Sequence, residues 1–191
     1  MRLDDAGGDL TWVPAQERPD LLAPAVERAL RAWDHAGDVL VAAIDPSVAD
    51  TAAFMAAHGV APEASANCVV VSGRRAGQER VAACMVLATT RADVNGLVKR
   101  TLDVRKASFL SSDAAVERSG MAYGGITAVG LPPEWDLLVD ERVAGTPFVV
   151  IGSGVRHSKL ALPGGHLALL PGARVVSGLG VGMGNGLSGV G

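Results

Sequence analysis

The chain has 191 residues, of which 49% are hydrophobic, 19% are charged and 4% are aromatic, and its formal net charge is −3. This length suits one domain with a substantial core, and the apolar content excludes a chain that is disordered throughout. Apolar runs are too short for a membrane-spanning helix, the acidic start lacks a signal-peptide core, and two cysteines cannot form a disulfide framework. We therefore expect a cytoplasmic protein with no membrane partner.

Charge is distributed unevenly along the chain. Residues 74–118 carry nine cations and five acids, which gives +4, whereas the remaining residues carry eight cations and fifteen acids, which gives −7. A local basic face can hold a phosphate backbone even when the total charge is negative. The alternative is that these side chains lie on ordinary solvated faces of helices and turns.

The first predicted elements form an N-terminal extension, residues 1–38, and the start of a main domain. Residues 20–33 carry apolar side chains at helical spacing and predict an amphipathic helix. This helix packs on the domain or contacts a partner, and packing is the simpler expectation. The continuous apolar run 39–44 predicts a buried strand, so we place the main domain at 39–177.

Capping signals follow this strand. Asp45-Pro46 ends it, and Ser47, with Asp50 three residues later, predicts the start of a helix. Gly59 predicts the end of that helix.

A hairpin and a short helix come next. The strand candidates 68–72 and 80–88 flank the turn residues 73–77, which is typical of a hairpin. Thr90 and Asp93 have capping-box spacing and predict a short helix that runs through Arg100.

The second half alternates short strands with helices. Residues 102–109 are expected to be extended, and Ser111 or Ser112 predicts a helix that ends at Gly120. Further strands are predicted at 126–129, 137–140, 148–151, 160–162 and 174–176, with a short helix at 166–170. The mixture of hairpins and crossovers indicates an α/β fold without regular βαβ alternation.

Residues 178–191 contain seven glycines in fourteen positions and predict a flexible tail. The repeated Gly-x-Gly there is not followed by a predicted helix, so it lacks the mechanism of a nucleotide-binding loop.

Two glycine-rich turns are the most informative candidates for chemistry. Gly124 and Gly125 precede a predicted strand, and their backbone N–H groups can converge on an anion or on an oxyanion; a tight turn is the alternative. The turn Gly152-Ser153-Gly154 is also consistent with a plain hairpin. Asp140 ends a buried strand and is either a helix cap or a pocket group.

Histidine and cysteine spacing indicates no metal site. The four histidines are scattered, and none stands at ligand spacing from an acid. Cys68 and Cys84 lie in apolar runs and are expected to be buried structural thiols. We therefore predict no metal and no cofactor.

Several segments, taken in order, resemble the YbaK / prolyl-tRNA-synthetase-associated editing domain family. Asp45-Pro46 followed by a helix, Gly59-Val60 and the strand 68–71 are similar to the family's opening. The stretch Gly120-Met-Ala-Tyr-Gly-Gly-Ile-Thr127 resembles its signature glycine loop. Leu138-Val139-Asp140 and the turn 149–156 follow with fitting spacing, and the resemblance covers residues 40–177.

The resemblance implies a mixed, curved, partly barrel-like β-sheet with flanking helices. It also implies hydrolysis, without a metal, of the ester that joins a wrong small amino acid such as Cys, Ala or Ser to tRNA. The enzyme would act in trans to the synthetase. The implied partners are the tRNA acceptor end and an aminoacyl-tRNA synthetase, and the chain would be a monomer or a dimer.

The resemblance also implies site residues, which it assigns by matching motif positions. The implied catalytic residues are Gly124, Gly125, Thr127 and Asp140. The implied substrate-binding residues are Asn67, Tyr123, Ile126, Gly152, Ser153, Gly154 and Arg156.

Two positions depart from the family pattern. Asn67 stands where the family usually has a pocket lysine, and Ala128 stands where the glycine loop usually has proline. Asn brings a hydrogen bond but no charge, so Lys106 or Lys159 would have to supply a cation from elsewhere. The departures leave two alternatives open: a catalytically weakened binding module for tRNA, a synthetase or a small aminoacyl-like ligand, and a different hydrolase on the same scaffold.

Overall fold

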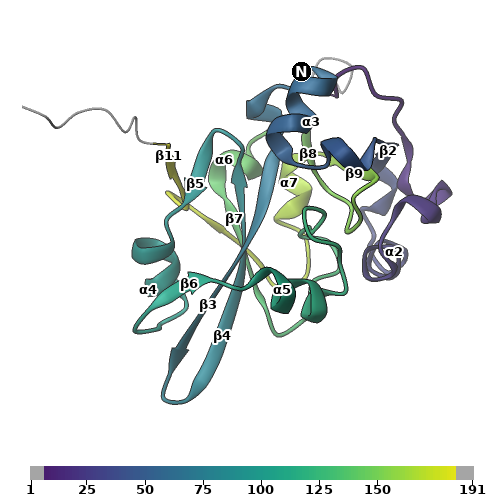
Figure 1. Cartoon of the computed structure of the whole chain (residues 1–191). Coiled ribbons are helices and arrows are strands. Elements are labelled where there is room, and N and C mark those ends of the chain that lie inside the picture. Colours follow the sequence, from purple (N-terminus) through teal and green to yellow (C-terminus); the bar gives the residue numbers. More distant parts are fainter. Residues whose placement is uncertain (1–6, 184–191) are drawn as a thin grey trace, which may run out of the picture.

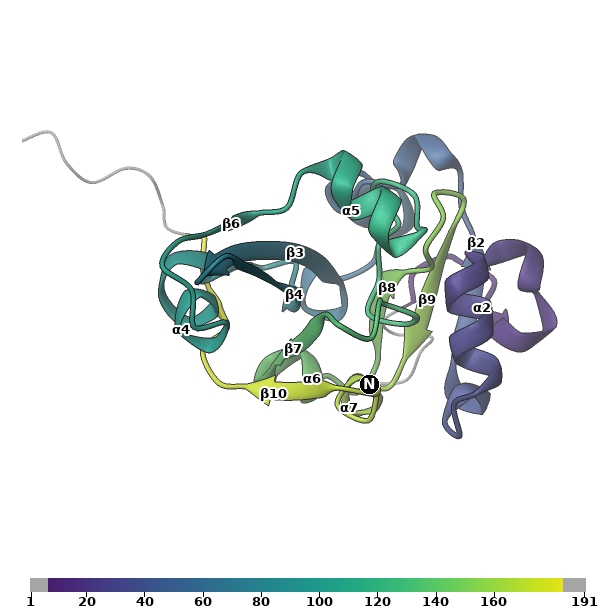
Figure 2. The same cartoon turned by 90° about the horizontal axis from the view of Figure 1, so that it is seen from below.

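The computed structural model describes residues 7–183, whose strands form two main sheets and one short ribbon (Figure 1 and Figure 2). The larger sheet has five strands in the order β10-β7-β4-β3-β6, the second has four in the order β1-β2-β9-β8, and β11 and β5 form the ribbon. The strands are β1 Val13–Pro14, β2 Leu40–Ala43, β3 Ala66–Arg75, β4 Gln78–Leu87, β5 Thr90–Ala92, β6 Ala107–Phe109, β7 Asp136–Asp140, β8 Val149–Gly152, β9 Ser158–Leu162, β10 Ala173–Val176 and β11 Gly180–Gly182.

Helices are short and flank the sheets. They are α2 Pro24–Arg31, α3 Thr51–His58, α4 Lys99–Thr101, α5 Ser112–Ser119, α6 Glu141–Ala144 and α7 Gly164–Leu167, and a π-type turn, Val94–Val98, leads into α4. In the part of the chain that the structure describes, no helix is long and apolar enough to cross a membrane.

The five-stranded sheet is mixed. Strands β3 and β4 form an antiparallel hairpin that turns at Ala76 and Gly77, whose φ angles of +49° and +81° suit a two-residue hairpin turn. Both strands are longer than the predicted hairpin. Strand β7 runs parallel to β4, and β10 runs parallel to β7, so the sheet combines a hairpin with crossover connections.

The two sheets approach each other along one edge of each. A single parallel bridge between Ser65 and Val150 joins the start of β3 to β8, and beyond it the two edges diverge. Figure 2 shows the sheets side by side, with α2 outside the four-stranded sheet. Within residues 7–183 neither sheet closes into a barrel, so the predicted mixed, curved and flanked architecture is confirmed in its open form.

Apolar side chains of β7 alternate between two cores. Leu137 and Val139 point into the larger core, which also contains Ile151 and Leu160 of the second sheet, whereas Leu138 points into a core with Val98 and Leu102. Alternation with a period of two places successive side chains on opposite faces. The five-stranded sheet is therefore buried on both faces, which explains the nearly continuous apolar run of β7.

The N-terminal extension packs on the domain. Val26 and Leu30 of α2 are buried in the larger core, and the amide of Ala23 donates to the carbonyl of Ser153 at 3.2 Å. The helix is shorter than the predicted 20–33.

Two predicted helix caps are wrong by a few residues. Asp50, not Ser47, caps α3: its Oδ1 accepts the amides of Ala52 and Ala53, while Asp45 caps the preceding 3-10 turn. Asp93, not Thr90, caps the turn into α4. In both cases the predicted residue belongs to the preceding element: Ser47 lies in the 3-10 turn Pro46–Val48, and Thr90 lies in β5.

Two other predictions are also wrong. Residues 126–129 form a buried loop rather than a strand. Gly180–Gly182 is not a flexible tail, because β11 pairs antiparallel with β5. The rest of the predicted tail, residues 184–191, lies outside the described residues.

Candidate active site

A cavity of about 430 Å³ lies in the wedge between the diverging edges of β3 and β8. Strand β6 pairs only with Val71–Gly73, so among the described residues no strand pairs along the first half of β3 on this side. The starts of α3 and α5 and the loop around Gly124 complete the wall. The volume falls within the range of small-molecule sites.

A buried lysine, Lys159 of β9, lines the cavity. The residue is 6% exposed, its Nζ donates to the carbonyl of Ala49 at 2.8 Å, and Nζ stands 5.1 Å from the ring centre of Phe54. Burial lowers the pKa of Lys159 to about 8, although nearby Asp50 opposes the change. An ammonium group has three donors, and among the described residues only one is used. Lys159 is therefore equipped to donate to a bound ligand.

Asn67, at the position of the usual family lysine, also lines the cavity. Its Oδ1 accepts the hydroxyl of Thr51 at 2.6 Å, which ties β3 to the start of α3. The buried cation of the cavity is therefore on β9 instead of β3, and the other cation in the lining, Arg156, is half-buried and donates to two backbone carbonyls. Lys106, the other predicted source of charge, is not among the residues that line it.

The glycine loop contributes one amide rather than two. Gly125 donates its amide to the carbonyl of Ala122 at 2.9 Å, and its carbonyl accepts the amide of Gly154 at 2.7 Å. Gly124 lines the cavity with φ at +79°, and among the described backbone hydrogen bonds its amide donates to none. Gly124 is the amide that remains for an oxyanion.

Arg156 holds this loop in place. Its Nη1 donates to the carbonyl of Tyr123 at 3.1 Å, and its Nη2 donates to the carbonyl of Pro46 at 3.0 Å. The glycine loop is thus connected to the turn that precedes α3. Tyr123, Ile126, Gly152 and Arg156 all line the cavity, as predicted for substrate-binding positions.

Close packing supports the loop from behind. A Cβ on Gly152 would lie 2.4 Å from the carbonyl oxygen of Gly125, so the backbones of β8 and the loop touch directly. A Cβ on Gly125 would lie 2.5 Å from the carbonyl oxygen of Val155. Side chains at either position would displace the loop from the cavity.

Three predicted residues lie behind the cavity wall. Thr127 is fully buried, and its hydroxyl has no hydrogen-bond partner among the described residues. Ser153 is fully buried and shares a hydrogen bond of 2.7 Å with the hydroxyl of Ser158. Gly154, with φ at +84°, packs against Ala23 of the N-terminal extension. None of the three lines the cavity.

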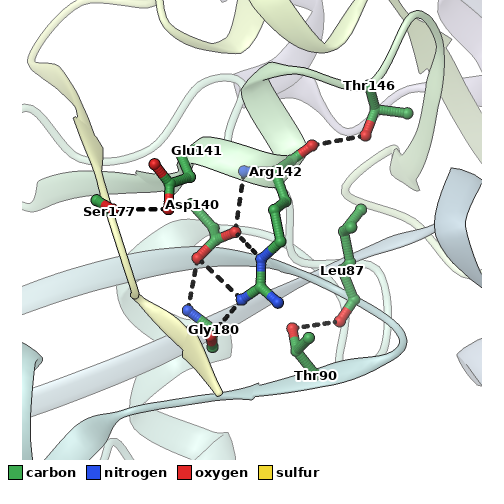
Figure 3. Close-up of polar contacts among 8 residues, drawn as sticks. All are labelled: Leu87, Thr90, Asp140, Glu141, Arg142, Thr146, Ser177 and Gly180. Atoms are coloured by element: carbon green, nitrogen blue, oxygen red, sulfur yellow. Dashed lines mark hydrogen bonds and ion pairs between the residues drawn. The ribbon is translucent and has the colours of Figure 1, made fainter. Parts of the chain in front are cut away.

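Asp140 also lies outside the cavity lining, in the network drawn in Figure 3. Its Oδ1 accepts Nε of Arg142 at 2.9 Å and the Arg142 amide at 3.0 Å, and its Oδ2 accepts the amide of Gly180 at 2.6 Å. Burial by itself raises the pKa of Asp140, but these donors outweigh it, and the pKa is lowered. Of the two alternatives left by the sequence, the structure places Asp140 as the N-cap of α6.

The two cysteines differ in exposure, and burial raises the pKa of both thiols. Cys68 lines the cavity, yet burial raises the pKa of its thiol well above the ordinary value. Burial also raises the pKa of Cys84, to about 12. Cys84 is buried, as expected for a structural thiol, whereas Cys68 is only half-buried.

The structure brings His166 to His35 and Asp38, which stand three residues apart in the sequence, and so groups three potential metal ligands. One ligand atom each of His35, Asp38 and His166 lie within 4.8 Å of one another, away from the cavity. Spacing along the chain could not reveal this group, because His166 comes from a distant segment.

A model of the aminoacyl-tRNA editing domain matches residues 45–169, more than half of the chain. The chain therefore belongs to the aminoacyl-tRNA editing domain family, and the predicted resemblance is confirmed. The matched range contains every predicted site residue. No curated protein sequence matches the chain significantly.

Solved structures with this fold are similar at low sequence identity. A protein described only as hypothetical has a TM-score of 0.70 at 22% identity and covers 82% of this chain and 99% of its own. A candidate trans-editing enzyme for prolyl tRNA synthetase has a TM-score of 0.68 at 22% identity and covers 82% of this chain and 97% of its own. A scaffold used for epitope grafting gives the same values. At this identity the likeness establishes the fold.

Proposed function

We propose that this protein is a trans-acting aminoacyl-tRNA deacylase that cleaves a mischarged small amino acid, such as Cys, Ala or Ser, from tRNA. Membership of the editing-domain family and the likeness to a candidate trans-editing enzyme for prolyl tRNA synthetase support this class of reaction. The proposal rests on one observation: Lys159 and Gly124 line the same cavity.

The reaction requires stabilisation of a developing negative charge. When water attacks the ester carbonyl carbon, charge collects on the carbonyl oxygen, and the bond to the ribose oxygen then breaks to release the amino acid. The amide of Gly124 and the ammonium of Lys159 both line the cavity with donor capacity left, beside the partly used guanidinium of Arg156. Such donors, fixed before the reaction, favour the transition state over the ground state.

Water activation does not require a protein base in this proposal. The Asp140 carboxylate accepts from four donors, and burial raises the pKa of the Cys68 thiol, so neither serves as one. A hydroxyl of the terminal ribose orients the water instead.

The basic segment 74–118 supports contact with tRNA phosphates at one end of the hairpin. Arg75, Arg80 and Arg118 are paired with acids, whereas Arg74 is exposed at the hairpin tip with no ion pair among the described residues. Strand β3 runs from the cavity to this tip, a span of about 30 Å. An acceptor stem whose end enters the cavity can therefore reach the exposed cations, which give affinity without sequence readout.

Deacylation of a panel of mischarged tRNAs tests the proposal. Purified protein is incubated with Cys-, Ala- and Ser-tRNA, and release of the amino acid is followed for the wild type and for Lys159→Met. We expect hydrolysis of at least one substrate by the wild type and loss of hydrolysis in the variant. A wild type that leaves all three substrates intact refutes the proposal.

A weakened binding module is the second candidate, because position 67 lacks the usual lysine and the Asn67 side chain is engaged by Thr51. Two variants separate the candidates. If the protein is an enzyme in which Lys159 replaces the usual lysine at position 67, adding Asn67→Lys to the Lys159→Met variant restores hydrolysis. If the wild type binds tRNA but is inert and Asn67→Lys alone creates hydrolysis, the protein is a binding module.

A further inference from the structure

A cluster of two histidines and one aspartate lies where the N-terminal extension meets α7. His35 and Asp38 stand three residues apart at the two ends of one 3-10 turn, in which side chains at this spacing eclipse each other. His166 lies on α7, and one ligand atom of each residue falls within 4.8 Å of the other two. The imidazole rings of the two histidines are 4.9 Å apart between centres.

The spacing within this cluster suits shared ligation better than direct pairing. Nδ1 of His166 is shielded from solvent and has no hydrogen-bond partner among the described residues, and it stands 3.7 Å from Oδ2 of Asp38. That distance is too long for a hydrogen bond. Two ligand atoms bonded to one tetrahedral zinc ion at about 2.0–2.1 Å lie roughly 3.3 Å apart, so small side-chain movements would close the site.

Both segments that carry the ligands are held firmly. The amide of Gly164, which begins α7, donates to the carbonyl of Thr146 at 3.0 Å, and a Cβ there would lie 2.1 Å from the carbonyl oxygen of Val143. On the other side, Ala36 within the 3-10 turn is buried in the larger core. The ligands are thus positioned on anchored backbone, as a selective metal site requires.

We propose that His35, Asp38 and His166 bind one Zn²⁺ ion, with water in the fourth position. Two imidazole nitrogens and one carboxylate oxygen are a donor set that zinc accepts and that magnesium and calcium do not favour. The ion would link the N-terminal extension to α7 across more than a hundred residues of chain. This site is separate from the proposed deacylase cavity and does not depend on its activity.

Zinc binding to the full-length, chelator-treated protein tests the site. We expect one ion per chain by isothermal titration, and a rise in Tm of about 5 °C or more at a free Zn²⁺ concentration one hundred times Kd. His166→Ala and His35→Gln should each weaken binding at least tenfold. His58→Gln is the matched control, because His58 also pairs with a carboxylate, that of Asp9 at 2.8 Å, and should bind zinc as the wild type does.

A spectroscopic readout localises the ion independently of stability. The ring of Trp33 is 5.6 Å from that of His35 and 6.3 Å from that of His166, so bound Co²⁺ should quench the fluorescence of Trp33 and leave the Trp33→Phe variant unaffected. Absence of one-to-one binding, or equal binding by His35→Gln and the wild type, overturns the proposal. If His166→Ala does not fold, His35→Gln with the cobalt readout decides the matter.

Discussion

Two buried charges in this molecule, Asp140 and Lys159, have opposite surroundings. Asp140 is fully buried and accepts hydrogen bonds from Nε and the amide of Arg142 and from the amide of Gly180 (Figure 3). Lys159 is 6% exposed and donates to the carbonyl of Ala49, its one hydrogen bond among the described residues. The carboxylate has little capacity left, whereas the ammonium retains two donors beside a cavity.

Under the proposed function, the difference separates a structural charge, Asp140, from a functional one, Lys159. Donors raise the stability of the charged carboxylate, so the pKa of Asp140 is lowered in spite of burial. Lys159 has no comparable compensation, so burial lowers its pKa to about 8 and destabilises the charged form. A buried charged group with unused hydrogen-bond donors can form its remaining hydrogen bonds with a substrate.

The largest expected effect is on stability, from Asp140→Ala. Removal of the carboxylate leaves Arg142 and the amide of Gly180 without their acceptor and removes the N-cap of α6, so the free energy of unfolding should fall by about 3 kcal/mol. Urea denaturation measures this loss, and deacylation per folded molecule should stay within about twofold of the wild type.

A control on the same strand is Asp136→Ala. Its side chain is 43% exposed and pairs with half-exposed Arg174 at 3.1 Å, so the loss should be below about 1 kcal/mol. A stable Asp140→Ala variant without hydrolysis would reverse the comparison and give Asp140 a catalytic role.

The next effect is on activity, from Lys159→Met. Loss of a preorganised charged donor should lower kcat/KM for deacylation at least about 100-fold. Stability should be unchanged or higher, because methionine fills a similar volume without a buried charge. Arg174→Met, which removes an exposed cation far from the cavity lining, is the control. Equal activity in Lys159→Met and the wild type would exclude Lys159 from the reaction.

A smaller effect should appear in the pH dependence of stability. Because the pKa of Lys159 falls from its ordinary 10.5 to about 8, the unfolded chain binds more protons than the folded one between these pH values. The free energy of unfolding of the wild type should therefore rise relative to Lys159→Met, by about 2 kcal/mol from pH 8 to pH 10. Urea midpoints at several pH values measure it. A constant difference between the two proteins would mean that the pKa of Lys159 is not lowered.

Local signals in the sequence were sufficient for much of the fold. The α5 helix begins after Ser111, one of the two predicted caps, and ends at Gly120 as predicted, because both the capping hydroxyl and the left-handed glycine act within one helical turn. The apolar run that becomes β7 was also predicted. Residues 126–129 were wrongly predicted as a strand, since Ala128 and Val129 are buried by packing in the larger core and not by strand pairing.

The candidate site could be predicted only in part. Tyr123, Gly124 and Arg156 line the same cavity. The resemblance could predict that they lie together, because it matched all three to motif positions of one family. The role of Asp140 depended on Gly180, forty residues later, in a segment predicted to be a flexible tail. Lys159 was one of two candidate cations, and only the approach of β9 to the start of α3 distinguishes it from Lys106.

The smallest effect should come from Gly124→Ala, which perturbs the second donor of the cavity without removing it. Alanine at a φ of +79° is strained, and its Cβ would lie 2.9 Å from Nη1 of Arg156, the atom that donates to the carbonyl of Tyr123. The arginine can move away, but the loop then loses one of its two links to Arg156. We expect kcat/KM to fall about tenfold, as measured in the same deacylation assay.

Gly172→Ala isolates the cause of that loss. Gly172 has a similar φ of +73°, a Cβ there would have no atom within 4 Å, and the residue precedes β10, away from the cavity lining. Both variants carry backbone strain, but only Gly124→Ala displaces Arg156. A loss confined to Gly124→Ala places the oxyanion donor in the glycine loop beside Lys159. Equal activity in the two variants would exclude the Gly124 amide as an oxyanion donor and make the loop, like the network around Asp140, a part of the scaffold.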